Sequence, residues 1–171
     1  MKKNQNIILI GMMGSGKTTI GQSLAFQKSY QFMDTDRLII KKEKLSISEI
    51  FQSKSEQYFR NLETDICKSL SRYSRTVIST GGGIILRPEN GTLLKQSGFI
   101  IFLDASAESI LTRIKNDKNR PLLQKPNKKE IIHELVQQRH SLYSNLADLI
   151  VNTNQFNIKL IVDTIIKQLP I

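Results

Sequence analysis

A glycine-rich segment close to the start of the chain has residue types and spacing suited to holding phosphate groups. An apolar run at residues 7–10 predicts a buried strand, and the sequence G-M-M-G-S-G-K-T follows it directly. Backbone N–H groups can surround a polyphosphate only where no Cβ atom blocks their approach, and Gly11, Gly14 and Gly16 lack that atom. We therefore predict a phosphate-binding P-loop. The alternative, a structural turn with an incidental lysine, would not need the strand, the glycines, the Lys-Thr pair and a helix in this order.

The helical pattern that begins after the last of these glycines supplies two more groups. The N-terminus of a helix directs unpaired N–H groups and the positive end of its dipole at a bound anion. The ammonium of Lys17 can reach the outer phosphates, and the hydroxyl of Thr18 is placed to ligate Mg²⁺. The chemistry predicted for this end of the protein is nucleotide binding.

Polar residues and glycines also follow two later strands. The segment Y-Q-F-M-D-T-D predicts a short strand that delivers Asp34 and Asp36 at its carboxyl end, and T-V-I-S-T predicts another that runs into the glycines at 81–83. Parallel strands carry their functional loops at this end, so both groups should lie beside the P-loop. Two structural alternatives stay open. Asp36 could be the N-cap of a helix starting at Arg37, and the glycines could form a sharp turn.

The elements that must position these groups follow from the periodicity of apolar residues. Strands alternate with helices throughout, which predicts a single α/β domain, doubly wound, with a five-stranded parallel sheet. The interval 39–74 has a mostly helical pattern, with Ser48 capping a helix from Glu49, and suits a small subdomain laid over the sheet. The polar segment 116–126 contains two prolines and predicts a surface loop that holds Arg120. A helix predicted over 128–146 should turn these apolar residues toward the core: Ile132, Leu135, Val136, Leu142 and Leu146.

Composition limits the partners that the chain could have. Hydrophobic residues make up 39% of the 171 residues and charged residues 23%, and no apolar run approaches the ~20 residues that would span a bilayer. We therefore expect a cytoplasmic protein without a membrane partner. Cys67 is the single cysteine, so neither an internal disulfide nor a cysteine-based zinc site can form. The formal charge of +10 favours anionic partners, but the basic residues are dispersed and few aromatics interleave with them, so nucleic acid is not expected.

Several motifs occur together in one order along the chain. They are the P-loop, M-D-T-D at 33–36, E-x-x-F-R-x-x-E at 56–63, T-G-G-G at 80–83, R-P-L-L at 120–123 and R-x-x-L-Y at 139–143. In this order the chain resembles the shikimate kinase family over nearly its whole length. The resemblance implies transfer of the γ-phosphate of ATP to the 3-hydroxyl of shikimate, in aromatic amino acid and chorismate biosynthesis, with Mg²⁺ as cofactor. It also implies the fold of the nucleoside monophosphate kinases, with a substrate-binding subdomain at about 35–62 and a mobile lid at about 114–126. We expect a monomer.

The same resemblance assigns roles to individual residues. Asp36 would accept a hydrogen bond from the attacking hydroxyl, and Asp34 would support the metal at Thr18 through water. The catalytic residues that it implies are Lys17, Asp36 and Arg120. The residues implied to bind ATP are Gly14, Ser15, Gly16, Lys17, Thr18, Thr19 and Arg120. The residues implied to bind shikimate are Asp36, Arg60, Gly81, Gly82, Gly83 and Arg139, with the two arginines on its carboxylate.

The residues themselves leave alternatives to these roles. Arg60 and Arg139 could instead form surface ion pairs, and Glu63 is spaced to hold Arg60 as an i,i+3 pair. The chain also departs from the family, which usually has glycine where Ser55 stands and proline where Ser141 stands, and both changes affect local loop geometry. The alternative functions are a P-loop kinase for another small hydroxy acid or a nucleotide, and a nucleotide-dependent regulatory module without turnover.

Overall fold

A five-stranded parallel sheet forms the centre of the protein, in the strand order β2-β3-β1-β4-β5. The computed structural model describes residues 5–115 and 127–170. β1 lies between β3 and β4, with Ile8 paired to Ile78 on one side and to Ile100 on the other. The prediction of a doubly wound sheet with five parallel strands is thus confirmed. The strand bounds are β1 Asn6–Ile10, β2 Gln31–Asp34, β3 Thr76–Ser79, β4 Gly98–Asp104 and β5 Leu149–Asn152.

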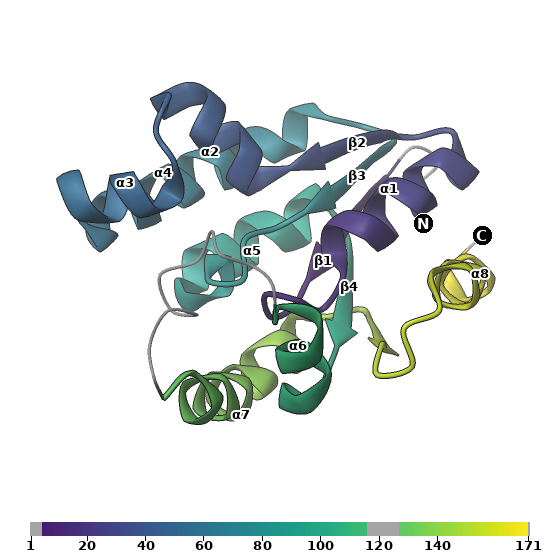
Figure 1. Ribbon diagram of the computed structural model, residues 1–171. Coiled ribbons are helices and arrows are strands. Elements are labelled where there is room, and N and C mark those ends of the chain that lie inside the picture. The colour runs from purple at the N-terminus through teal and green to yellow at the C-terminus, as the bar shows by residue number, and fades with distance from the viewer. Residues whose placement is uncertain (1–4, 116–126, 171) are drawn as a thin grey trace.

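Helices cover both faces of the sheet, which explains why β1 is apolar along its whole length. Ile7 and Leu9 face α1 (Lys17–Lys28) and α8 (Ile158–Gln168). Ile8 and Ile10 belong to the core that the other helices cover. Figure 1 shows α1 and α8 on one side of the sheet and α5 and α7 on the other. The helices whose residues contribute to this second core are α4 (Glu56–Ser69), α5 (Pro88–Ser97), α6 (Ala107–Arg113) and α7 (Lys128–Leu146).

A small group of helices extends from the β2 edge of the sheet and has an apolar core of its own. This group consists of α2 (Thr35–Glu43), α3 (Ile47–Ser53) and the first turns of α4 (Figure 1). Its buried residues are Ile39, Ile50, Phe59 and Leu62. The sequence prediction that Ser48 caps the helix from Glu49 is wrong, because Ser46 is the N-cap and forms a reciprocal capping box with Glu49.

Helix α7 has the predicted bounds, but one predicted core residue is wrong. Leu142 is 44% exposed, whereas Tyr143 beside it is 1% exposed and packs in the core under β4. The helix face that carries Ile132, Leu135 and Val136 continues through Tyr143, since a residue seven positions after Val136 lies nearly on the same side. The pattern favoured leucine because it is the more apolar residue.

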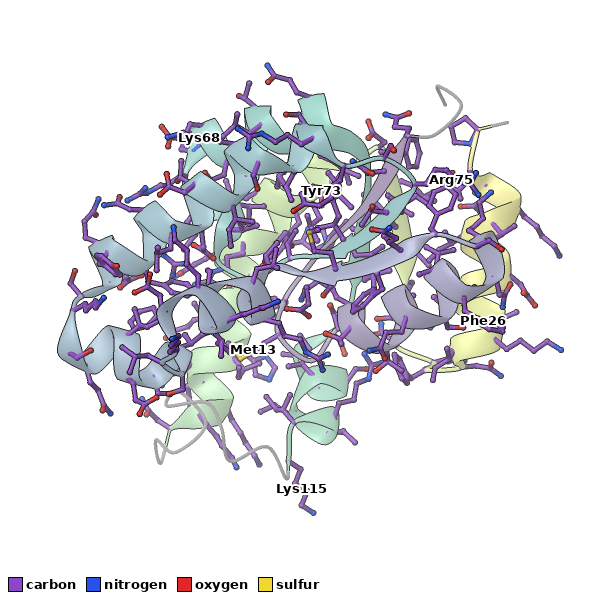
Figure 2. The ribbon with its side chains drawn as sticks, turned by 90° about the horizontal axis from the view of Figure 1, so that it is seen from above. Met13, Phe26, Lys68, Tyr73, Arg75 and Lys115 are labelled. Atoms are coloured by element: carbon purple, nitrogen blue, oxygen red, sulfur yellow. The ribbon has the colours of Figure 1, made fainter. Side chains whose placement is uncertain are left out.

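The carboxyl ends of the strands share one edge of the sheet. In Figure 2, which is seen from above, Met13, which follows β1, and Lys115, which follows α6, lie in the lower half of the view. Tyr73 and Arg75, which precede β3, lie in the upper half. In the residues described, no helix is both long enough and apolar enough to cross a membrane.

Candidate active site

The loop between β1 and α1 has the backbone conformation that its glycines allow. Gly11, Gly14 and Gly16 have φ values of 141°, 74° and 99°, in the region that side chains disfavour. A Cβ atom on Gly16 would also collide with the ring of Phe156. The loop ends at the N-terminus of α1, where Gly16 is the N-cap and no side chain satisfies the first N–H groups. Such a terminus is suited to an anion.

Lys17 is buried inside the curve of this loop. Its Nζ atom donates to the carbonyl oxygens of Gly11 and Met12, each at 2.8 Å. The ammonium is therefore fixed beside the backbone that would surround phosphate groups, and only 8% of the residue is exposed. A positive charge held in this way can stabilise the negative charge of a transferring phosphoryl group.

Thr18 and Asp34 are brought together from α1 and the end of β2. The Thr18 hydroxyl donates to Asp34 Oδ2 at 3.0 Å. The other carboxylate oxygen, Oδ1, accepts from the backbone N–H groups of Asp36 and Arg37, so Asp34 is the N-cap of α2. The capping role considered for Asp36 therefore belongs to Asp34. The Thr18 hydroxyl and the Asp34 carboxylate both offer oxygen atoms, the kind of metal ligand that Mg²⁺ prefers.

An ion-pair cluster on α4 forms the other end of the site. The Arg60 guanidinium donates to Glu63 at 2.7 Å and to Glu56 at 3.0 Å. Burial raises the pKa of Glu63, whose side chain is 1% exposed, and the charge of Arg60 only partly offsets this. Burial lowers the pKa of Arg60, but the two carboxylates outweigh it and leave that pKa raised. The cluster therefore keeps a partly buried cation at a fixed position.

The glycines at 81–83 pass between this cluster and the P-loop. A Cβ atom on Gly81 would lie 2.5 Å from Asp36 Oδ1, and one on Gly83 would collide with the Arg60 guanidinium. The carbonyl of Gly82 accepts a hydrogen bond from Arg139 Nη1 at 3.4 Å. The structure thus brings Asp36, Arg60 and Arg139 to one glycine turn.

Two residues at the site received no role from the sequence. Arg113 of α6 donates to the carbonyls of Gly14 and Thr153 and stacks over the Phe156 ring at 4.5 Å. Tyr143 of α7 donates its hydroxyl to the Gly82 carbonyl. Tyr143 ends the R-x-x-L-Y motif, so a signal for it was present, whereas Arg113 contacts backbone atoms that are far away in the sequence.

The predicted lid lies almost entirely outside the described residues. Arg120 and the segment 116–126 are among the residues that the structure does not describe, so the contacts expected of Arg120 stay a prediction. The described part of the predicted lid consists of Ile114, which is buried beside α6, and Lys115, which is exposed. The remaining predicted site residues all fall in the described part of the chain.

The sheet order, the loop after β1 and the oxygen donors at the end of β2 define a P-loop kinase. Comparison with known proteins narrows the class. The family model for shikimate kinase matches residues 13–170. A shikimate kinase of Caldicellulosiruptor bescii is 43% identical over 162 residues, which cover 95% of this chain and 94% of that protein. The shikimate kinase of Geobacter sulfurreducens is 43% identical over 149 residues, covering 87% of this chain and 82% of that protein.

Solved structures agree with the sequence matches. The shikimate kinase from Acinetobacter baumannii, solved in complex with shikimate, superposes with a TM-score of 0.92 at 35% identity. The superposition covers 99% of this chain and 97% of that one. This chain belongs to the shikimate kinase family. It is accordingly an enzyme, a phosphotransferase with an alcohol acceptor, and the family's reaction is the ATP-dependent phosphorylation of shikimate. Neither a different acceptor nor a module without turnover is favoured by these findings.

Proposed function

We propose that this protein transfers the γ-phosphate of ATP to the 3-hydroxyl of shikimate across the contact between its P-loop and its glycine turn. One observation supports this arrangement most directly. Gly82 packs on the P-loop so closely that a Cβ atom there would lie 3.3 Å from the backbone nitrogen of Met13. An acceptor held at the glycine turn is thereby adjacent to the loop that holds the outer phosphates. Reacting groups held side by side avoid much of the entropic cost of meeting.

The nucleotide end would use backbone and a few side chains. The N–H groups of residues 14–19 surround the phosphates, and Lys17 adds its charge at the outer ones. Thr18 and Asp34 are the residues that would hold Mg²⁺, the first directly and the second through water. A bound Mg²⁺ neutralises phosphate charge and fixes its orientation. The close approach of Thr18 Oγ1 to Asp34 Oδ2, 3.0 Å, fits this division of roles.

The acceptor end would use the two arginines and Asp36. Arg60 and Arg139 bind the shikimate carboxylate, since a guanidinium fork matches a carboxylate in angle as well as in charge. With the carboxylate fixed, the opposite hydroxyl points toward the phosphate. A carboxylate such as Asp36 is a weak base. Asp36 would therefore mainly orient the attacking hydroxyl and would accept the hydroxyl proton late in the transfer. The helices α2 and α3 and the start of α4 form the subdomain that supplies Asp36 and Arg60.

The role proposed for Arg120 rests on the sequence alone, because this residue lies outside the described part of the chain. As part of a closing lid it would add a cation beside the transferring phosphate and exclude water. We also propose that the protein is a monomer, because the contacts described above assemble the site within a single chain, and that it acts in the cytoplasm, as expected from the sequence.

A coupled assay of ADP release against a panel of acceptors tests the function. The panel contains shikimate, gluconate and nucleoside monophosphates, each with ATP and Mg²⁺. We expect turnover with shikimate at least about a hundred times that with any other acceptor. Nucleoside monophosphates have no carboxylate for the arginine pair, and gluconate, which has one, carries its hydroxyls on a flexible open chain that does not hold any of them at a fixed distance from that carboxylate. Faster release with gluconate or a nucleotide would overturn the proposal, and so would release that does not depend on an acceptor.

A further inference from the structure

The hydroxyl of Tyr143 lies where the nucleotide end and the acceptor end meet. Tyr143 is 1% exposed, yet its hydroxyl has neighbours on both ends of the site. It donates to the carbonyl of Gly82, and it lies 3.7 Å from the sulfur of Met12 in the P-loop. Burial raises the pKa of Tyr143 to about 12, so the hydroxyl keeps its proton and stays a donor at neutral pH.

The ring that carries this hydroxyl is held firmly. It stacks on Phe102 of β4, with centroids 5.0 Å apart and planes 23° from parallel. Arg139 lies one helical turn earlier on α7, on the same face, and donates to the same Gly82 carbonyl. Two donors from one rigid helix therefore converge on a single backbone oxygen.

The position of that oxygen matters because the backbone of Gly82 packs directly on the P-loop. A Cβ atom on Gly82 would lie 3.3 Å from Met13 N and 3.5 Å from Gly11 O. The carbonyls of Gly11 and Met12 in turn accept from Lys17. A shift of the Gly82 carbonyl would therefore change the spacing between the acceptor-binding turn and the loop that holds Lys17.

We propose that Tyr143 is a positioning residue for phosphoryl transfer, whose hydroxyl fixes the Gly82 carbonyl and with it the distance from the acceptor to the P-loop. The inference rests on the proposed function, because it concerns how the two substrates are aligned. Phosphoryl transfer depends mainly on alignment and charge, so a small displacement of the acceptor is costly. Tyr143 itself touches neither substrate in this account.

The substitution Tyr143→Phe tests the proposal, because it keeps the ring and its stack and removes only the hydroxyl. We expect kcat with shikimate to fall about ten-fold, the scale of one lost buried hydrogen bond, while the Kd for ATP stays within about two-fold. Tyr73→Phe is the matched control. Tyr73 is 39% exposed and precedes β3, and it lies in the upper half of the view in Figure 2, whereas Met13 lies in the lower half. A purely structural role for Tyr143 would lower the unfolding midpoint and leave kcat of the folded enzyme unchanged.

Two further variants distinguish a positioning role of Tyr143 from a structural one. Combining Tyr143→Phe with Arg139→Lys should give a loss in kcat that differs from the product of the single losses, because both donors act on one carbonyl. Phe102→Leu removes the stacked ring without removing a hydrogen-bonding group and should also lower kcat. A wild-type kcat in folded Tyr143→Phe, or a double loss equal to the product, rejects the positioning role and leaves the proposed function standing. A wild-type enzyme that releases no ADP with shikimate overturns both.

Discussion

The two ends of the site are built in different ways. Most of the nucleotide end comes from one continuous stretch, residues 11–19, in which three glycines adopt positive φ and Lys17 donates to the loop's own carbonyls. The acceptor end is assembled from α2, α4, the glycine turn and α7, which lie far apart in the sequence. One of its two arginines, Arg60, is positioned by the side chains of Glu63 and Glu56.

This difference predicts two kinds of sensitivity. The P-loop depends on backbone conformation and on one buried charge, so damage there should abolish turnover with any acceptor. The acceptor end depends on the geometry of ion pairs, so damage there should be graded and specific to shikimate. Variants that separate kcat/KM for shikimate from the affinity for ATP test this distinction.

The largest effect is expected for Lys17→Ala. Loss of a buried ammonium that we propose contacts the outer phosphates should lower ATP-dependent turnover by about a thousand-fold, because phosphoryl transfer depends strongly on charge stabilisation. ADP release measures the loss, and thermal unfolding verifies the fold. Lys28→Ala, in the last turn of the same helix, is the matched control and should behave as wild type. Near-normal turnover of folded Lys17→Ala would refute the P-loop assignment.

The next effect concerns the two arginines. Arg60→Lys and Arg139→Lys keep the charge but lose the fork, which costs on the order of 2 to 4 kcal/mol, or roughly thirty-fold to several-hundred-fold in kcat/KM for shikimate. The Kd for ATP should hardly change. Arg72→Lys, at an exposed position after α4, serves as control. If ATP affinity falls as far as shikimate turnover does in these variants, the two ends are not separable and the carboxylate role is wrong.

A smaller effect is expected for glycine substitutions, which compare the two ends directly. Gly83→Ala would push against the flexible end of Arg60, so the protein should fold and lose about ten-fold in kcat/KM for shikimate. Gly16→Ala would need a strained φ and a displaced Phe156, so ATP affinity should suffer instead. Gly91→Ala lies inside α5, meets only the side chain of Leu146 at 3.3 Å, and should leave activity unchanged. Equal losses of ATP affinity at Gly16 and Gly83 would contradict the comparison.

The nucleotide end is more predictable from the sequence than the acceptor end, because the first is mostly continuous and the second is assembled from distant segments. The first strand, the P-loop and the start of α1 could be predicted because their signals lie in one short stretch of sequence. The glycines there are required by the positive φ angles of the loop. The bounds of α7 were also predictable from its periodicity. The burial of Tyr143 in place of Leu142 was not predictable, since it depends on the Phe102 ring and the Gly82 carbonyl, which are far away in the sequence.

Contacts made by side chains to distant backbone were the least predictable. Arg113 reaches carbonyls of residues 14 and 153, and nothing in its own neighbourhood indicates either. The cap of α3 differs, because its signal was local: Ser46 stands three residues before Glu49, which is the spacing of a capping box, and Ser48 does not. The place of Arg60 at the acceptor end was expected only through the family motifs, because its contact with the glycine turn is tertiary. The strand ends had already indicated that Asp36 and the glycines lie beside the P-loop.

The smallest predicted effect is on stability, and it reports on the helix that supports the acceptor end. Cys67 lies on α4 one turn after Glu63 and is buried in the core beneath the site. Burial raises the pKa of its thiol to about 12, and the charge of Glu63 adds to the shift. In the unfolded chain a thiol loses its proton near pH 8.5 to 9. Between that pH and about 12 the folded state therefore binds more protons than the unfolded state, so this group makes stability fall as pH rises.

Cys67→Ala removes this dependence while leaving every other titrating group in place. The wild-type free energy of unfolding minus that of the variant, measured in urea with a reducing agent, should therefore decrease by about 1.5 to 2 kcal/mol between pH 7 and pH 10. Shikimate kinase activity at pH 7 should be nearly the same in both proteins, since the thiol lies in the hydrophobic core and has no role in the proposed phosphoryl transfer. A difference in unfolding free energy that stays constant across this range would show that α4 opens enough to hydrate the thiol. The acceptor end would then be less firmly supported than the buried Arg60 and Glu63 pair indicates.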